Sequence, residues 1–292
     1  MTKTDYVTTR DGHELFVRDW GSGSPILFLA GWSMTSDLWG EVMVPLVDRG
    51  FRAVAYDRRG HGRSSDGGVV DYDSLADELA EVVWARDLRG CTVVAHSGAV
   101  GEVIRHVTRH GSAPIARAVF VGAQGPCVLQ RHDNQDGLSP EAFDMLMARL
   151  KGDYQAWLDE NLEAFAPQAS RRTLDWVYLM VRGCSRQMGI DVQNVFAGAD
   201  LRAEAATLDL PVTIIHGDRD ASAPIDRSAR RYAELIPGAK LIVYEGAAHG
   251  LMLTHAPRLV DDIIEAARET VTEPRPGRGA GTSPIRAKAA AE

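Results

Sequence analysis

Six short apolar runs constrain the fold of this chain more than any other feature of its sequence. Each lacks the alternation of polar and apolar residues that marks a half-solvated strand, which is typical of strands buried on both faces of a parallel sheet. The runs are residues 26–30 (ILFLA), 52–56 (RAVAY), 91–96 (CTVVAH), 115–121 (IARAVFV), 211–216 (PVTIIH) and 240–244 (KLIVY).

Amphipathic helical patterns separate these runs. Residues 73–88 place Leu75, Leu79 and Val82 on one face, and a second pattern at 100–107 starts directly after the run 91–96. The alternation of strands and helices predicts an α/β fold, with a mostly parallel sheet and helices on both faces. Ligands of such sheets bind beyond the carboxyl ends of the strands, so the strand-to-helix loops are where functional side chains are expected.

Two regions depart from this alternation. Residues 6–9 and 14–20 flank an Asp-Gly turn signal, which predicts a β-hairpin at an antiparallel edge. A further hairpin turn is expected at Gly21-Ser22-Gly23, which precedes a strand and therefore does not match a dinucleotide-binding loop. Residues 124–208 carry only helical patterns, and we expect a helical lid over the functional end of the sheet.

These patterns divide the chain into three parts. Residues 1–123 and 209–271 are predicted to form the α/β core, and residues 124–208 the lid (cap). Residues 272–292 are rich in Pro, Gly and Ala and predict a disordered C-terminal tail.

Charge and composition exclude several classes of protein. The 292 residues contain 32 Lys and Arg against 40 Asp and Glu, a net charge of −8, which offers no broad basic surface to nucleic acid or an anionic membrane. No apolar run approaches the roughly 18 residues of a membrane span. Three cysteines are too few for a disulfide framework and favour a cytoplasmic location. The oligomeric state stays open, a homo-oligomer included.

Ser97 stands where the third apolar run meets a helix. The pentapeptide Ala95-His96-Ser97-Gly98-Ala99 has small residues on both sides of the serine, as in a nucleophile elbow, where bulky neighbours would collide with the strand and helix. Such a turn projects the hydroxyl above the sheet. In a chain rich in Gly and Ala the pentapeptide alone is a weak signal. Whether Ser97 is a nucleophile therefore depends on finding the acid and the histidine of a catalytic triad elsewhere in the sequence.

A serine hydroxyl becomes a nucleophile when a histidine takes its proton and a carboxylate orients that histidine. Asp218 and Asp220 follow the run 211–216, and His249 follows the run 240–244. Each stands at a strand-end loop, in the order Ser, Asp, His that this architecture uses. Three weak signals together predict a serine hydrolase.

Five motifs occur in order along residues 5–270: Ala30-Gly31-Trp32, residues 56–65 (YDRRGHGRSS), the elbow continued by Gly101-Glu102-Val103, residues 216–220 (HGDRD) and His249-Gly250-Leu251. With these motifs the chain resembles α/β-hydrolases of the non-haem haloperoxidase and aryl-esterase branch. The resemblance implies the α/β-hydrolase fold and a catalytic triad of Ser97, His249 and Asp220, in preference to Asp218.

The same resemblance implies an oxyanion hole formed by the backbone N–H groups of Trp32 and Gly98. It further implies that a small-molecule carboxylic ester or lactone, largely apolar, is cleaved through an acyl-enzyme without cofactor or metal. Hydrogen peroxide could open the same acyl-enzyme to a peracid as a side activity.

The chain departs from the family pattern at three positions. The family usually has His at the position of Ala30, a larger residue such as Met at Gly98, and Gly at Ala99. A glycine at position 98 predicts more room beside the nucleophile and hence a bulkier substrate.

Other candidate residues have structural interpretations. Residues 57–65 are expected to form a tight turn with internal Asp and Arg pairs, and His216 lacks a third partner for a metal site. Cys127 is expected to be a buried, inert thiol, and His96 to pack and hydrogen-bond with its ring away from Ser97. Most large lid side chains are expected in the lid core, although some must face the pocket: Trp157, Phe165, Trp176, Tyr178, Met180 and Met188.

Two other classes of function remain as alternatives. A cofactor-free oxygenase would use the histidine as a base on an aromatic substrate, but its histidine partner comes from the loop after the fourth strand, and residues 122–126 (GAQGP) hold no acid. A non-catalytic binding protein has no need of Ser, Asp and His together at strand-end loops.

Overall fold

A single sheet of eight strands organises the computed structural model, which describes residues 5–269; the predicted tail lies outside these residues. The strand order is β1-β2-β4-β3-β5-β6-β7-β8. The strands are β1 (Tyr6–Thr8), β2 (Glu14–Gly21), β3 (Pro25–Leu29), β4 (Arg52–Tyr56), β5 (Cys91–His96), β6 (Ile115–Val121), β7 (Val212–Gly217) and β8 (Lys240–Tyr244).

The pairing of the strands confirms the predicted mostly parallel sheet with an antiparallel edge. β1 and β2 pair antiparallel, as do β2 and β4, and the other neighbouring strands are parallel. The expected hairpin turn at Gly21-Ser22-Gly23 is wrong, because β4 lies between β2 and β3 and the turn joins strands that do not pair. The predicted hairpin between β1 and β2 is confirmed.

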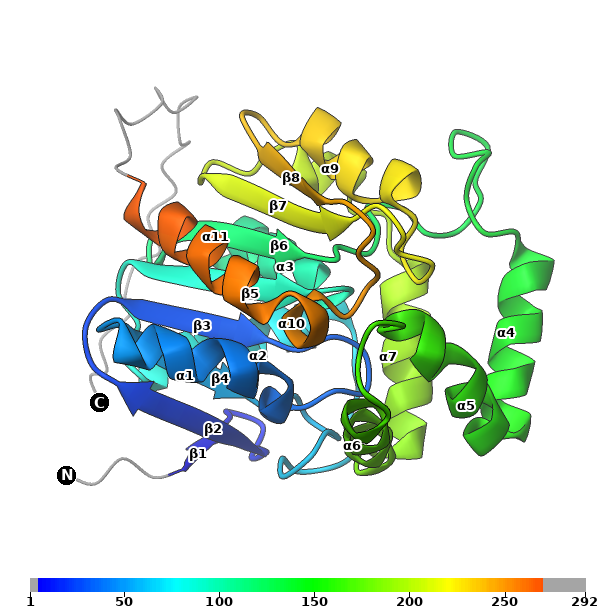
Figure 1. Cartoon of the computed structure of the whole chain (residues 1–292), viewed down its shortest axis with the longest axis horizontal. Coiled ribbons are helices and arrows are strands. Elements are labelled where there is room, and N and C mark those ends of the chain that lie inside the picture. The colour runs from blue at the N-terminus through cyan, green and yellow to red at the C-terminus, as the bar shows by residue number, and fades with distance from the viewer. Residues whose placement is uncertain (1–4, 270–292) are drawn as a thin grey trace, which may run out of the picture.

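Helices cover both faces of this sheet (Figure 1). In that view α1 (Gly40–Asp48), α10 (Leu251–Thr254) and α11 (Ala256–Arg268) lie in front of the sheet, and α2 (Tyr72–Ala85) and α3 (Ala99–His110) lie behind it. Two short helices, α8 (Arg202–Ala205) and α9 (Ala229–Leu235), contact each other, and α8 also contacts α3. Two 3₁₀ turns lie at Ser36–Trp39 and Ile225–Arg227.

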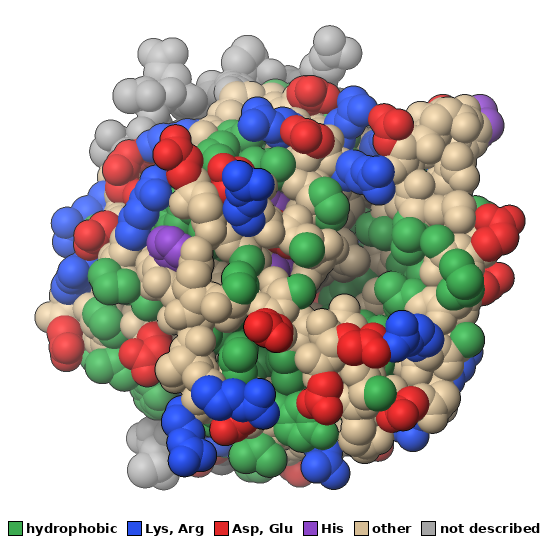
Figure 2. Space-filling model, turned by 45° about the vertical axis from the view of Figure 1, so that its right-hand side comes forward, with side chains coloured by type: hydrophobic (Ala, Val, Ile, Leu, Met, Phe, Trp, Pro, Cys, Tyr) green, Lys and Arg blue, Asp and Glu red, His purple; other side chains and the backbone are tan. Residues whose placement is uncertain are grey.

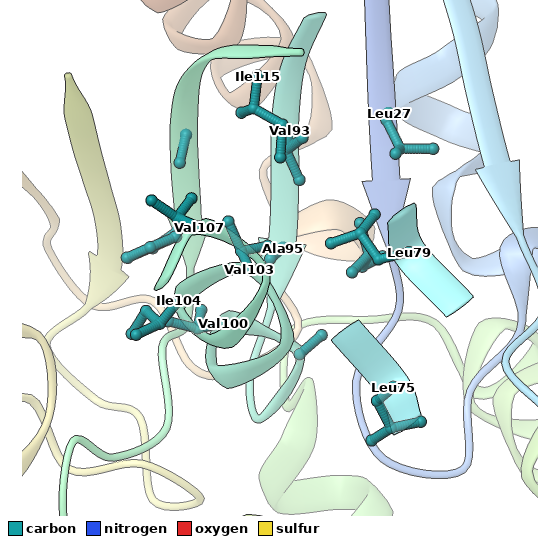
Figure 3. Close-up of a cluster of buried hydrophobic side chains, with 14 of the residues drawn as sticks. Leu27, Leu75, Leu79, Val93, Ala95, Val100, Val103, Ile104, Val107 and Ile115 are labelled. Carbon is teal, nitrogen blue, oxygen red and sulfur yellow. The ribbon is translucent and has the colours of Figure 1, made fainter. Parts of the chain in front are cut away.

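The central strands are buried on both faces. In β3, Ile26 and Phe28 belong to the hydrophobic cluster under α1 and α11, whereas Leu27 belongs to the cluster under α2 and α3. Figure 3 shows Leu27 of β3 and Val93 of β5 in that second cluster, with side chains of α2 and α3 around them. Because water reaches neither face, these strands need no polar alternation, and the apolar runs of the sequence follow.

Four helices between β6 and β7 form the lid: α4 (Pro140–Gly152), α5 (Tyr154–Phe165), α6 (Arg171–Arg182) and α7 (Arg186–Gly198). Each begins at a Ser or Asp whose side chain accepts a backbone N–H of the first turn: Ser139, Asp153, Ser170 and Ser185. The arrowheads of β3 and β7 point toward these helices in Figure 1, so the lid lies at the carboxyl ends of the strands. The boundaries 1–123, 124–208 and 209–271 stay predictions. Within residues 5–269, no helix has the length and apolar character needed to cross a bilayer.

Candidate active site

Ser97 occupies the tight turn between β5 and α3. Its φ is +59°, in the left-handed region that non-glycine residues rarely adopt. Its N–H donates to the carbonyl of Val121 at 3.0 Å, and its carbonyl accepts from the N–H of Gln124 at 3.2 Å. The turn is thereby fixed against the end of β6, and Ser97 lines a cavity beneath the lid.

Gly31, in the loop after β3, lies directly against this turn. A Cβ atom at Gly31 would come within 3.0 Å of the Ser97 Cβ and 2.7 Å of the His96 Nδ1. Only glycine allows the loop that carries Trp32 to approach the nucleophile so closely.

His249, which lines the same cavity as Ser97, contacts Asp220. The Nδ1 atom of His249 lies 2.6 Å from Oδ2 of Asp220, and both side chains are buried. Asp220 also accepts the N–H of Ala223 at 2.8 Å on Oδ1, and its Oδ2 lies 3.2 Å from Nε2 of His216. The carboxylate is held from three sides, which fixes the orientation of the His249 ring.

The surroundings of Asp220 keep its carboxyl ionised. Burial by itself raises the pKa of Asp220, but the charge of His249 and the hydrogen bonds from His216 and His249 outweigh it, so the pKa lies well below its ordinary value. Asp218, in contrast, is exposed and accepts the N–H of Gly246 at 2.7 Å. Asp220, not Asp218, is the carboxylate in contact with His249.

The loop after β6 also lies against His249. A Cβ at Gly122 would lie 3.2 Å from the His249 Nδ1, so this loop offers packing and no carboxylate. The partner of the histidine therefore comes from the loop after β7, unlike the arrangement of the oxygenase alternative.

The two expected oxyanion donors belong to Trp32, which lines the same cavity as Ser97, and to Gly98, the next residue in the chain. Gly98 is the N-cap residue of α3, where backbone N–H groups point out of the helix and the helix dipole favours negative charge. Trp32 is fixed by its ring, because its Nε1–H donates to the carbonyl of Gly189 on α7 at 2.6 Å. The ring also meets Trp157 of α5 edge to face, with centroids 5.0 Å apart.

Arg58 binds the backbone of the loop that carries Trp32. Its guanidinium donates to the carbonyls of Ala30 at 2.8 Å and Gly31 at 3.3 Å, and its Nε donates to the buried carboxylate of Glu102 at 2.9 Å. Asp57 nearby accepts the N–H of Ser36 at 2.7 Å. These contacts agree with the structural role expected for residues 57–65.

A cavity of about 270 Å³ lies beneath the lid. Its floor includes Ser97, His249 and Trp32, and apolar lid side chains such as Trp157 and Phe165 form its walls. Figure 2 shows a hollow in this face of the molecule with hydrophobic side chains along one side. Of the large lid side chains expected in the core, Met180 and Met188 are buried, and Trp176 is 40% exposed at a separate groove.

The expectation of extra room beside Gly98 is wrong. A Cβ at Gly98 would lie 1.9 Å from Cδ2 of Phe196, a side chain of α7 that fills this space. Sequence reasoning missed this packing of Phe196 against the turn that carries Ser97. The missing side chain at position 98 was the available signal, because a void beside a nucleophile is normally filled from elsewhere.

The structure also shows the surroundings of three other residues considered in the sequence, His96, Cys127 and His216. His96 is buried against His249, with ring centroids 4.6 Å apart, and neither ring nitrogen has a hydrogen-bond partner, so the expected hydrogen bond is absent within residues 5–269. Cys127 is free and buried, as expected. His216 contacts Asp220, and no group of three His, Cys, Asp or Glu residues within residues 5–269 is arranged to hold a metal ion.

The family model described as "Alpha/beta hydrolase family" matches residues 26–262. The chain belongs to this family. It is 37% identical over 268 residues to a non-heme haloperoxidase of Rhodococcus erythropolis, covering 89% of this chain and 97% of the relative. It is 35% identical over 276 residues to a bifunctional esterase/perhydrolase of Acinetobacter calcoaceticus, covering 90% and 99% of the two chains.

Among solved structures, a bromoperoxidase from Bacillus anthracis shares this α/β-hydrolase fold with a TM-score of 0.86. It is 28% identical, and the match covers 90% of this chain and 99% of that one. These similarities confirm the predicted fold, the resemblance and a hydrolase activity. The predicted hydrolysis of carboxylic esters agrees with the name of the esterase/perhydrolase relative.

Proposed function

We propose that this α/β hydrolase cleaves small, largely apolar carboxylic esters or lactones through an acyl-enzyme on Ser97. The observation that carries the proposal is the 2.6 Å contact of Asp220 with His249, a residue that lines the same cavity as Ser97. A buried carboxylate on Nδ1 keeps the proton there and leaves the Nε2 lone pair free to act as a base.

The reaction then follows from the positions of these groups. His249 takes the Ser97 proton as the hydroxyl attacks the ester carbonyl, and the N–H groups of Trp32 and Gly98 stabilise the oxyanion. His249 returns the proton to the departing alcohol, which leaves an acyl-Ser97 ester. Water, activated by the same histidine, releases the acid. Hydrogen peroxide in place of water would give a peracid, in keeping with the name of the esterase/perhydrolase relative.

The test is an ester and lactone panel, including p-nitrophenyl butyrate and bulkier acyl groups, with wild type and Ser97→Ala in parallel. We expect the variant to lose at least about 10³-fold in kcat. Ser222→Ala is the matched control, since Ser222 lines the same cavity, and it should stay within about tenfold of wild type.

A fluorophosphonate probe separates the alternatives. Wild type should gain one adduct, located on Ser97 by mass spectrometry, and Ser97→Ala none. Absence of both turnover and adduct would favour a binding protein, and oxygen uptake with a quinolone-type substrate would favour the oxygenase. The cytoplasm remains the proposed location, since Cys91, Cys127 and Cys184 are all free.

A further inference from the structure

Among the described residues, the side chains that line the catalytic cavity include no Lys, Arg, Asp or Glu. The polar side chains around it are those of His96, Ser97, Gln124, Asn161, Gln193, Ser222 and the catalytic His249. The remaining lining is aliphatic or aromatic. A charged group on a substrate would therefore leave water without meeting a partner of opposite sign.

Away from the oxyanion donors, a fixed negative charge also disfavours anions in the cavity. Asp220 lies directly behind His249 with its side chain fully buried, and its lowered pKa keeps it negatively charged. The whole chain carries a net charge of −8. A carboxylate on a substrate would thus be desolvated and also repelled, because Coulomb interactions are strong where water is excluded.

Gln193 is placed to contact the substrate. It lies on α7 four residues after Gly189, which binds the ring of Trp32, and three before Phe196, which packs on Gly98. This face of α7 covers the two loops beside the nucleophile. Within residues 5–269 the side-chain amides of Gln193 and Gln124 make no hydrogen bond, so both can pair with a neutral ketone, hydroxyl or amide on a substrate.

We propose that this enzyme selects uncharged esters and lactones, accepts neutral hydrogen-bonding groups on the acyl chain, and rejects acyl chains that carry a carboxylate. The inference rests on the proposed esterase function and names the substrate class of that site. It further assigns Gln193 as a residue that determines charge specificity.

Three ethyl esters of nearly equal size test the proposal: ethyl pentanoate, ethyl 4-oxopentanoate and monoethyl succinate. The last two differ by a methyl group against an oxygen anion at the chain end. With ethanol release as the readout, we expect kcat/KM for both neutral esters to exceed that for monoethyl succinate by about 100-fold or more, because an unpaired charge is costly to bury.

A charge introduced at Gln193 tests the assigned residue. Gln193→Arg should raise kcat/KM for monoethyl succinate at least about tenfold, since a guanidinium pairs well with a carboxylate. Gln193→Met, which keeps similar length without charge, should leave the preference for neutral esters in place. Circular dichroism checks that both variants fold. If Gln193→Arg does not fold, the comparison of the three esters with wild type still tests the charge selection.

The outcomes separate this inference from the proposed function. Equal turnover of monoethyl succinate and ethyl 4-oxopentanoate by wild type would overturn the charge selection while leaving the esterase intact. A folded Gln193→Arg with no gain toward the anionic ester would overturn the role of Gln193. Failure to hydrolyse any ester, with Ser97→Ala no worse, would overturn the proposed function itself.

Discussion

The ring of Phe196 occupies the position that a side chain on Gly98 would need. Phe196 stacks on Tyr72, with ring centroids 5.6 Å apart and an interplanar angle of 15°, and the Tyr72 hydroxyl donates to the Gly98 carbonyl at 2.9 Å. A lid residue, a residue of α2 and the nucleophile elbow therefore form one packed unit. The departure from the family pattern at position 98 is compensated by a side chain about a hundred residues later in the chain.

Gly98→Met should consequently damage the enzyme. The new side chain collides with Phe196, and we expect at least a tenfold loss of kcat/KM with about 1–3 kcal/mol of lost stability. The double variant Gly98→Met/Phe196→Ala should regain stability and activity relative to the single one, as measured by urea denaturation and ester hydrolysis. Simple additivity of the two changes would show that they do not share this space.

Asp220→Asn should abolish most activity without unfolding the protein. Loss of the carboxylate removes the group that fixes the His249 tautomer, and losses near 10⁴-fold in kcat are typical of such a change. Asp218→Asn is the matched control two residues away, because Asp218 is exposed and contacts only the loop at Gly246. A larger effect at Asp218 would reassign the acid.

The lowered pKa of Asp220 also predicts a pH dependence of stability. A carboxyl whose pKa is lower in the folded state stabilises the fold at pH values above its ordinary pKa of 3.8, and that contribution is lost as the pH falls through the folded-state value. Wild type should therefore exceed Asp220→Asn by about 2 kcal/mol in unfolding free energy at pH 7. The difference should shrink steadily below about pH 4; a difference that stays constant from pH 7 to pH 2 would contradict the assignment.

Arg58 and Glu102 form a buried pair, and breaking it from one side should be costly. Arg58→Met leaves the Glu102 carboxylate unpaired and removes the donors to the Ala30 and Gly31 carbonyls, for an expected loss of about 3–5 kcal/mol. Adding Glu102→Leu should recover part of this loss in thermal denaturation. If the double variant is less stable than Arg58→Met alone, the unpaired Glu102 carboxylate is not the main cause of the lost stability.

Trp32→Phe tests the contact between the lid and the oxyanion loop. The backbone N–H stays in place, but the Gly189 carbonyl loses its donor, and we expect about 1–2 kcal/mol of destabilisation. A several-fold fall in kcat with little change in KM should accompany it, since the backbone donor becomes less rigidly held. An unchanged kcat would show that the loop keeps its geometry without this bond.

Much of the fold was predictable because strands that are buried on both faces of a sheet appear in the sequence as continuous apolar runs. The run 91–96 and the glycine and alanine around Ser97 are local features, and the loops at Asp220 and His249 follow strands that are equally clear. The convergence of those three loops is a property of parallel sheets, so the contact between Asp220 and His249 needed no long-range information beyond the fold.

The lid residues were not predictable in the same way. Gln193 and Phe196 lie on a helix whose pattern says only that one face is apolar, and which strand-end loop that face meets depends on how four helices pack. Phe196 fills the space beside Gly98, and Trp32 donates a hydrogen bond to Gly189. Both contacts depend on tertiary distances of a few ångströms. A periodicity of 3.6 residues carries no such information.

The hydrogen bond between the Trp32 ring and Gly189 has a practical meaning for engineering. A lid transplanted from another hydrolase brings its own backbone carbonyls and its own side chain in place of Phe196. It would therefore change the support of the loops at Trp32 and Gly98 as well as the substrate pocket. Productive grafts onto this scaffold will need positions 32, 98, 189 and 196 exchanged as a set.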